Sequence, residues 1–126
     1  MYELAPPRTQ AGGVWAEAIL HVFTGFNDGR APSGSLAIGA TGALYGTAFW
    51  GGYGEPSCAR GCGTLFALSP ATGSKWTLSV LHRFTAQNGD GANPQSTLVP
   101  GAGQMLYGTT DYGGTAGFGT VFQLQP

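Results

Sequence analysis

The sequence is poor in charge and almost without lysine. Only 9% of the 126 residues are charged, about a third of the usual fraction in globular proteins. Five basic and six acidic side chains give a net charge of −1, and Lys75 is the single lysine. A nucleic-acid or anionic-membrane partner needs a basic patch that this composition does not supply. No apolar run approaches 18 residues, so we expect no membrane insertion, and the residues after Met1 do not resemble a signal peptide.

Motifs for catalysis and for metal binding are also missing. The chain has no Gly-x-Ser-x-Gly, no His-Glu-x-x-His, no phosphate loop and no dinucleotide fingerprint. His21 and His82 are the only histidines, and their spacing does not suit zinc; we expect hydrogen-bonded strand residues, no metal and no cofactor. The six carboxylates show no spacing that favours a glycosidase pair over chance: Glu3, Glu17, Asp28, Glu55, Asp90 and Asp111.

Only two cysteines are present, Cys58 and Cys62, with three residues between them. Redox and zinc motifs have two intervening residues, and zinc requires a second pair. We therefore predict a disulfide that closes a five-residue ring and suits an oxidising compartment. Such a small ring fixes the loop more than it stabilises the fold.

Glycine and aromatic residues are abundant instead. The 23 Gly and 8 Pro are about a quarter of the chain, yet 42% of residues are apolar and 12% aromatic. This apolar content is too high for a disordered chain. The length suits one domain with a modest core.

The chain is an internal repeat. Three pairs of segments align at offsets of 61, 62 and 56 residues: Trp15–Thr24 with Trp76–Thr85, Leu44–Thr47 with Leu106–Thr109, and Gly63–Phe66 with Gly119–Phe122. The first copy carries extra residues in its last loop, which contains both cysteines. A third fragment, Tyr2–Pro6, resembles Phe122–Pro126. We divide the single repeat domain into residues 1–14 (the end of a preceding repeat and a linker), 15–75 and 76–126.

Each repeat is predicted to form four strands. In the second copy they are expected at Trp76–Phe84, Ser96–Val99, Met105–Thr110 and Thr120–Leu124, with turn signals such as Asp90-Gly91 between them. No stretch of 10–12 residues keeps a helical period. Four short strands per repeat are typical of a β-propeller blade, so the predicted fold is all-β, with two four-stranded blades per chain.

The repeated motifs resemble a known family. They are Leu-Tyr-Gly-Thr followed by Gly-Gly, Gly-Thr-(Val/Leu)-Phe-x-Leu-x-Pro, Trp-x-x-x-x-Leu-His-x-Phe-Thr, and Asp-Gly-x-x-Pro. Together they resemble the GloVer repeat of bacterial choice-of-anchor tandem-repeat proteins. That resemblance implies a secreted or surface-anchored propeller and an extracellular location, but it implies no particular activity.

The motif residues have structural interpretations. A mid-strand glycine such as Gly46 or Gly108 predicts a close approach by another backbone or sheet. Tyr45 and Tyr107 are expected to fill the wedge between blades, with ligand stacking as the alternative. The Asp-Gly pairs at 28–29 and 90–91 are predicted turns; metal or ligand contact is the alternative there.

The loop after Leu-Tyr-Gly-Thr differs most between the copies, and it is the candidate binding site. Its aromatic and acidic residues could stack on sugar rings and bind their hydroxyls: Phe49, Trp50, Tyr53, Asp111, Tyr112 and Phe118. In the alternative interpretation these rings only cover the rim of the blade.

Two blades cannot close a ring and would leave sheet edges bare. We therefore expect self-association, as a homotrimer with six blades. The favoured function is non-catalytic, lectin-like carbohydrate binding with a glycan as partner. The alternatives are a scaffold segment of a surface-anchored protein and a carboxylate-dependent glycoside-active enzyme.

Overall fold

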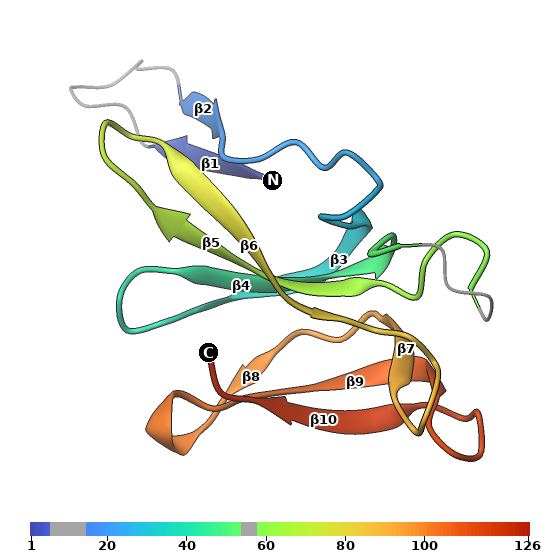
Figure 1. Cartoon of the computed structure of the whole chain (residues 1–126). Helices are drawn as coiled ribbons and strands as arrows, with labels where there is room; N and C mark the ends of the chain where they lie inside the picture. The colour runs from blue at the N-terminus through green and yellow to red at the C-terminus, as the bar shows by residue number, and fades with distance from the viewer. Residues whose placement is uncertain (6–14, 54–57) are drawn as a thin grey trace.

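The computed structural model describes residues 1–5, 15–53 and 58–126, and these form three antiparallel sheets (Figure 1). The first sheet pairs β1 (Tyr2–Ala5) with β2 (Ala16–Ile19). The second has the order β3 (Arg30–Ile38), β4 (Leu44–Trp50), β5 (Thr64–Pro70), β6 (Trp76–Arg83). The third contains β7 (Gly91–Pro94), β8 (Val99–Pro100), β9 (Leu106–Gly113) and β10 (Thr120–Leu124).

The all-β prediction is confirmed, with two four-stranded sheets and an additional two-stranded one. In the third sheet, β7 and β8 follow each other along one edge of β9, and β10 pairs with the other edge. A 3-10 turn, η1 (Ala102–Gln104), precedes β9. The sheets close no ring within the described residues. No helix in these ranges is long and apolar enough to cross a membrane.

Sheet boundaries and repeat boundaries do not coincide. Strand β6 opens the second sequence copy, but it pairs with β5 of the first, in the register Phe66 opposite Val80. The β1–β2 pair repeats this register at the equivalent positions, with Tyr2 opposite Ile19. Each repeat therefore contributes its first strand to the sheet of the preceding repeat, and β1–β2 corresponds to the outer half of such a sheet.

The prediction of a strand at Ser96–Val99 is wrong except at Val99, the first residue of β8. The backbone is extended at β7 and again at β8, and the segment between them is irregular. There the Ser96 hydroxyl accepts a hydrogen bond from the Thr109 N–H (2.8 Å) and donates one to the Thr109 carbonyl (3.3 Å). The side chain thus takes the place of a backbone ladder pair, an alternative that serine regularly offers.

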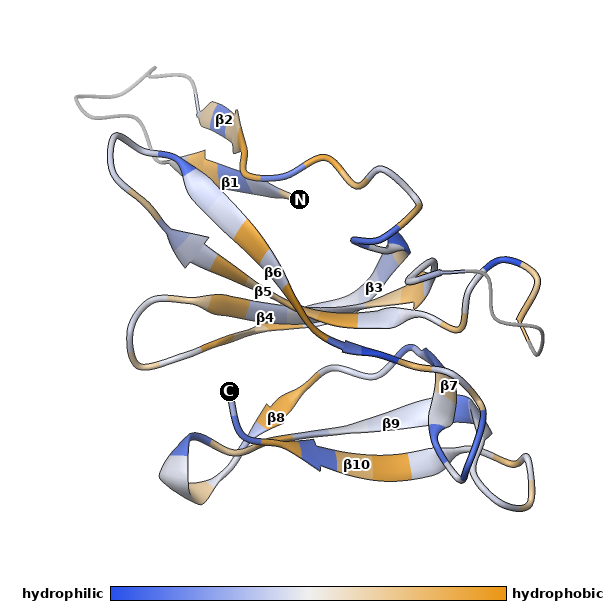
Figure 2. Ribbon diagram, in the orientation of Figure 1, coloured by the Kyte–Doolittle hydropathy of each residue, from blue (hydrophilic) through white to orange (hydrophobic). Residues whose placement is uncertain are grey.

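Two apolar layers hold the sheets together (Figure 2). The layer between the second and third sheets contains Leu65, Phe84, Leu98 and Leu106, with Tyr45 packed against it. Tyr45 therefore packs between two sheets as predicted, whereas Tyr107, for which the same role was predicted, is 40% exposed. The layer on the opposite face of the second sheet consists of Ala48, Phe66 and Leu68, and it is covered by Met1, Leu20 and Phe23. Equivalent residues of successive repeats therefore make the same kind of sheet-on-sheet contact.

The mid-strand glycines are tightly packed, as predicted, but the group that approaches them is a phenylalanine side chain and not another backbone or sheet. A Cβ added at Gly46 would lie 2.7 Å from Cζ of Phe66, and one at Gly108 would lie 2.5 Å from Cζ of Phe122. Both rings come from the adjacent strand of the same sheet, not from another sheet. Glycine is required because the outer atoms of each phenylalanine ring occupy the space that a Cβ would need.

Candidate functional site

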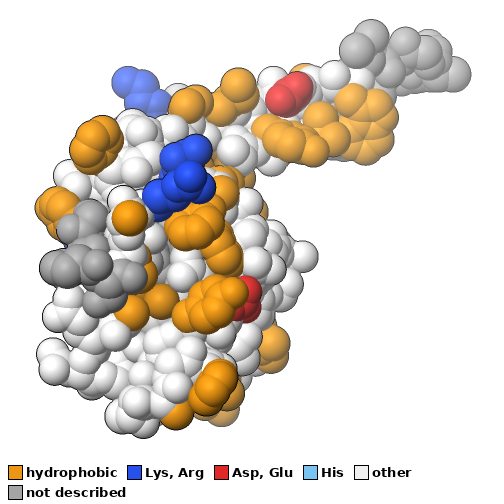
Figure 3. Space-filling model, turned by 90° about the vertical axis from the view of Figure 1, so that its right-hand side faces the viewer, with side chains coloured by type: hydrophobic (Ala, Val, Ile, Leu, Met, Phe, Trp, Pro, Cys, Tyr) orange, Lys and Arg blue, Asp and Glu red, His pale blue; other side chains and the backbone are white. Residues whose placement is uncertain are grey.

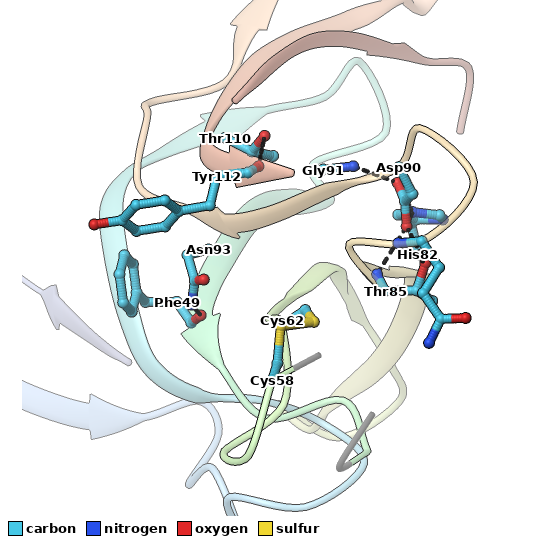
Figure 4. Close-up of a disulfide and its surroundings, with 11 residues drawn as sticks. Phe49, Cys58, Cys62, His82, Thr85, Asp90, Gly91, Asn93, Thr110 and Tyr112 are labelled. Carbon is cyan, nitrogen blue, oxygen red and sulfur yellow. Dashed lines mark hydrogen bonds and ion pairs between the residues drawn. A yellow bond between two sulfur atoms is a disulfide. The ribbon is translucent and has the colours of Figure 1, made fainter. Parts of the chain in front are cut away.

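Each histidine, together with the threonine three residues after it, forms hydrogen bonds to one aspartate carboxylate. We call this arrangement the bracket. The Asp28 carboxylate accepts hydrogen bonds from the Thr24 hydroxyl (2.6 Å) and the Thr24 N–H (3.0 Å), and it pairs with His21 Nε2 (3.0 Å). In the second copy, Asp90 pairs in the same way with His82 and with both groups of Thr85 (Figure 4). Because both copies have this bracket, we assign it to the fold and not to a site.

Hydrogen bonding lowers the pKa of Asp28 below its ordinary value. Burial, the largest single influence, opposes ionisation and would raise the pKa. The hydrogen bonds from the Thr24 hydroxyl and N–H and from His21 favour the carboxylate, and together they outweigh burial. The charged form of Asp28 is therefore the form that holds the turn.

Five of the six predicted site residues lie on or directly after the carboxyl ends of β4 and β9, and Phe118 lies on the β9–β10 loop. Phe49 and Trp50 end β4 and contact each other edge to face, with ring centroids 4.6 Å apart. Both are half-buried. Asp111 and Tyr112 occupy the equivalent end of β9 and are exposed.

These residues do not converge on a single cleft. Tyr53 is 55% exposed, Tyr112 59% and Phe118 91%. Figure 4 shows the rings of Phe49 and Tyr112 on the same side of the molecule, next to Asn93. Neither Asp111 nor Phe118 makes a side-chain hydrogen bond, ion pair or ring contact within the described ranges. The rings come from two sheets, two of them half-buried and three exposed, and we call this set the aromatic face: Phe49, Trp50, Tyr53, Tyr112 and Phe118.

Asn93 joins the two sheets beneath this face. Its side-chain amide donates to the Phe49 carbonyl (2.9 Å) and its backbone N–H to the Cys62 carbonyl (2.6 Å). The side chain is buried, and the backbone has a φ of 57°. Asparagine adopts this left-handed conformation more readily than most residues. Asn93 therefore fixes the end of β4, and with it Phe49, against β7.

Three arginines border the aromatic face, and the sequence analysis did not single them out. The Arg60 guanidinium lies 5.7 Å from the centre of the Trp50 ring, and the Arg83 guanidinium lies 5.0 Å from that of Tyr53. Both distances suit cation–π contact. Arg30 pairs with Trp50 across β3 and β4. Figure 3 shows Lys and Arg atoms interspersed with hydrophobic side chains on one side of the molecule.

A pocket of about 320 Å³ lies between these groups. Its lining comes from the β2–β3 connection, the start of β3 and the loop after β4: Gly25, Phe26, Arg30, Gly51, Tyr53, Ala59 and Arg60. The predicted disulfide between Cys58 and Cys62 is present and closes the turn that carries Arg60. The Arg60 carbonyl accepts a hydrogen bond from Gly51 N–H (2.8 Å), which joins this turn to the end of β4.

Comparison of the two copies could have identified the arginines from the sequence. Arg30 stands where the second copy has Ala92, and Arg83 stands where the first copy has Val22. Arg60 lies in the loop that the second copy lacks. Residues that a fold requires recur in every repeat, whereas residues found once are free to serve another purpose.

The fold defines the chain as an all-β tandem-repeat protein in which equivalent sheets pack face to face. Residues 2–126 match the model of the Gloeobacter/Verrucomicrobia repeat, and the chain belongs to that family. The resemblance found in the repeated motifs is thereby confirmed. No curated protein and no solved structure matches the chain.

Proposed function

We propose that this protein is a non-catalytic, extracellular carbohydrate-binding module whose sites recur at equivalent strand ends. The observation that carries the proposal is the aromatic face. Tyr53 and Tyr112, which follow β4 and end β9, keep more than half of their surface exposed. Isolated exposed rings are common, but a set of rings at equivalent strand ends is typical of an interaction site.

Sugars suit this face because they present apolar C–H surfaces that stack on aromatic rings. The strands below the face are fixed by Asn93 and by backbone pairing, so Phe49, Trp50 and Tyr112 are presented on rigid elements. The disulfide is consistent with an extracellular location. Weak sites that recur along an assembly gain strength through avidity.

Binding to a glycan array, with the wild-type chain and with Tyr112→Ala, tests this proposal. Loss of one stacking ring is expected to weaken binding by about 1–3 kcal/mol. Trp15→Ala is the matched control, because Trp15 is an exposed ring at the start of β2 and outside the aromatic face. If no glycan binds the wild-type chain, the carbohydrate proposal is wrong and the scaffold function takes its place.

We further infer that the sheets continue into a propeller-type ring formed by self-association. Leu65 of the second sheet is covered by the third sheet and is 1% exposed, whereas its equivalent Val121 is 81% exposed. Tyr107, the equivalent of the packed Tyr45, is exposed as well. The same face is therefore covered in one sheet and open in the next, and a further sheet of the same kind fits it.

The opposite end of the chain offers the complementary surface. Tyr2 and Leu4 of β1 are the equivalents of Phe66 and Leu68, which are buried, yet both are exposed. Two different surfaces that fit each other give head-to-tail association, which forms a closed ring when the rotation per unit permits. Three chains would contribute six four-stranded sheets, a number within the range of known propellers, together with three β1–β2 pairs that lie between chains.

Light scattering after size exclusion tests the assembly at micromolar concentration. We expect a species of about three chain masses, and we expect Val121→Glu to dissociate it. Thr72→Glu adds the same charge in the exposed β5–β6 turn and should leave the assembly intact. A monodisperse wild-type monomer of 12.9 kDa would exclude the ring.

A further inference from the structure

We propose that the pocket beside the aromatic face binds an acidic oligosaccharide, with Arg30 and Arg60 contacting a carboxylate or sulfate group of one sugar residue. This inference rests on the proposed carbohydrate binding and adds the class of sugar. It also names two ligand-contacting residues outside the aromatic face. The pocket of about 320 Å³ is at the lower end of the range for small-molecule sites.

The first support is the concentration of positive charge. The chain has five basic side chains and a net charge of −1, yet two of the five, Arg30 and Arg60, line this pocket, and Arg83 contacts Tyr53 at its edge. Within residues 1–5, 15–53 and 58–126, the only ion pairs are those of the two histidines, and none of the three arginines takes part in one. Arg30 and Arg60 are exposed, so an anion can reach both guanidinium groups.

The second support is that the fold does not need these arginines. In the other copy, alanine stands at the place of Arg30 and its strand β7 still pairs with β9, and a shorter loop replaces the one that carries Arg60. Arg60 contacts the Trp50 ring but takes part in no ion pair among the described residues, so its N–H donors, like those of Arg30, remain available to a ligand. Guanidinium groups bind carboxylate and sulfate oxygens through paired N–H donors, which lysine cannot do.

The third support is the rigid presentation of Arg60. The disulfide closes the turn Cys58–Cys62, and two backbone hydrogen bonds join the ends of this turn to Gly51: Gly51 N–H to the Arg60 carbonyl and Gly63 N–H to the Gly51 carbonyl. A residue held in this way loses little conformational freedom when it binds. The disulfide, which contributes little to the stability of the fold, therefore positions a ligand-contacting side chain.

Aromatic rings next to arginines could also suit single-stranded nucleic acid. Binding along a phosphate backbone needs a groove with many cations, however, and its affinity depends on their number. Here only two arginines line the pocket, and a third contacts Tyr53 at its edge, in a chain of net negative charge. One or two anionic groups on an otherwise neutral sugar chain match this arrangement better.

Calorimetric titration with paired ligands tests the proposal: oligogalacturonate against its methyl ester, and sulfated dextran against dextran. Each pair differs only in the anionic group, and the two pairs separate carboxylate from sulfate recognition. We expect the acidic member of at least one pair to bind at least tenfold more tightly, with affinity that falls as salt is added. Arg60→Gln is expected to remove most of this preference, and Lys75→Gln, which removes one positive charge in the distant β5–β6 turn, is expected to keep it.

The outcomes separate this inference from the carbohydrate proposal. Equal binding of acidic and neutral ligands, with Arg60→Gln unchanged, overturns the inference and leaves carbohydrate binding standing. No binding to any of the four ligands overturns the inference, and the glycan array then decides the wider proposal. Tighter binding of an oligonucleotide than of either acidic glycan also overturns it. Reduction of the disulfide should weaken acidic binding severalfold while neutral binding persists.

Discussion

The buried amide of Asn93 offers the sharpest test of how the two sheets are held. Asn93→Ala removes the hydrogen bond to the Phe49 carbonyl (2.9 Å) and leaves that acceptor without its partner, which costs about 1–3 kcal/mol. It also places alanine at a φ of 57°, a conformation that disfavours a Cβ by about 1–2 kcal/mol. The free energy of unfolding should therefore fall by roughly 2–5 kcal/mol.

Asn93→Gly separates the two contributions. Glycine also lacks the amide but adopts the left-handed conformation freely, so this variant should lose only the hydrogen-bond contribution of about 1–3 kcal/mol. Ala31→Gly is the matched control, because Ala31 has a φ of 55° at the equivalent place in β3 and is exposed. We expect that control to change stability by less than about 1 kcal/mol.

Urea denaturation followed by tryptophan fluorescence measures all three variants. The midpoint should decrease in the order Ala31→Gly, Asn93→Gly, Asn93→Ala, at a constant slope. Equal stability of wild type and Asn93→Gly would show that the hydrogen bond between the sheets contributes nothing. Equal loss for Asn93→Gly and Asn93→Ala would refute the conformational part of the argument.

Four further substitutions test the site, the bracket and the packing. Trp50→Ala should weaken glycan binding by about 1–3 kcal/mol with little change in melting temperature, whereas Tyr45→Ala, in the layer between sheets, should destabilise by about 3 kcal/mol; equal destabilisation by both would contradict a site at Trp50. Because the pKa of Asp28 is lowered by folding from 3.8, Asp28 stabilises the fold above about pH 4 and loses this effect as the pH falls further. Asp28→Asn should therefore lower the free energy of unfolding by about 1 kcal/mol at pH 7 and by less at pH 3, as measured by urea denaturation at both values; a pH-independent difference would be evidence against this assignment. Gly46→Ala should destabilise by about 1–3 kcal/mol, because its Cβ would meet Phe66 at 2.7 Å, and calorimetry showing an unchanged melting temperature would contradict it.

Several features were predictable because they depend on local chemistry. Turn dipeptides such as Asp90-Gly91, alternating strand residues and two nearly identical copies predicted an all-β repeat, and the strands β6, β9 and β10 lie close to their expected positions. The Cys58–Cys62 disulfide followed from spacing alone, since few other roles suit two cysteines four positions apart. These signals act within one strand, turn or loop.

The candidate site was only partly predictable. The rings of Phe49, Trp50 and Tyr112 could be named as the residues that differ between copies. Arg60 and Arg83 could not be assigned to them from sequence order, because they reach Trp50 and Tyr53 from a loop and from a strand of the next repeat. Contacts of this kind depend on how strands are ordered within a sheet.

The sequence by itself determined the family, the repeat, the strand content and the disulfide. Tertiary structure decided that β6 completes the sheet of the preceding repeat, that Ser96 interrupts a strand by bonding to Thr109, and which faces are covered. Leu65 and Val121 occupy equivalent positions in the repeat, yet one is buried and the other exposed. Burial is a property of the neighbouring sheet, and no pattern within a single repeat encodes whether that neighbour is present.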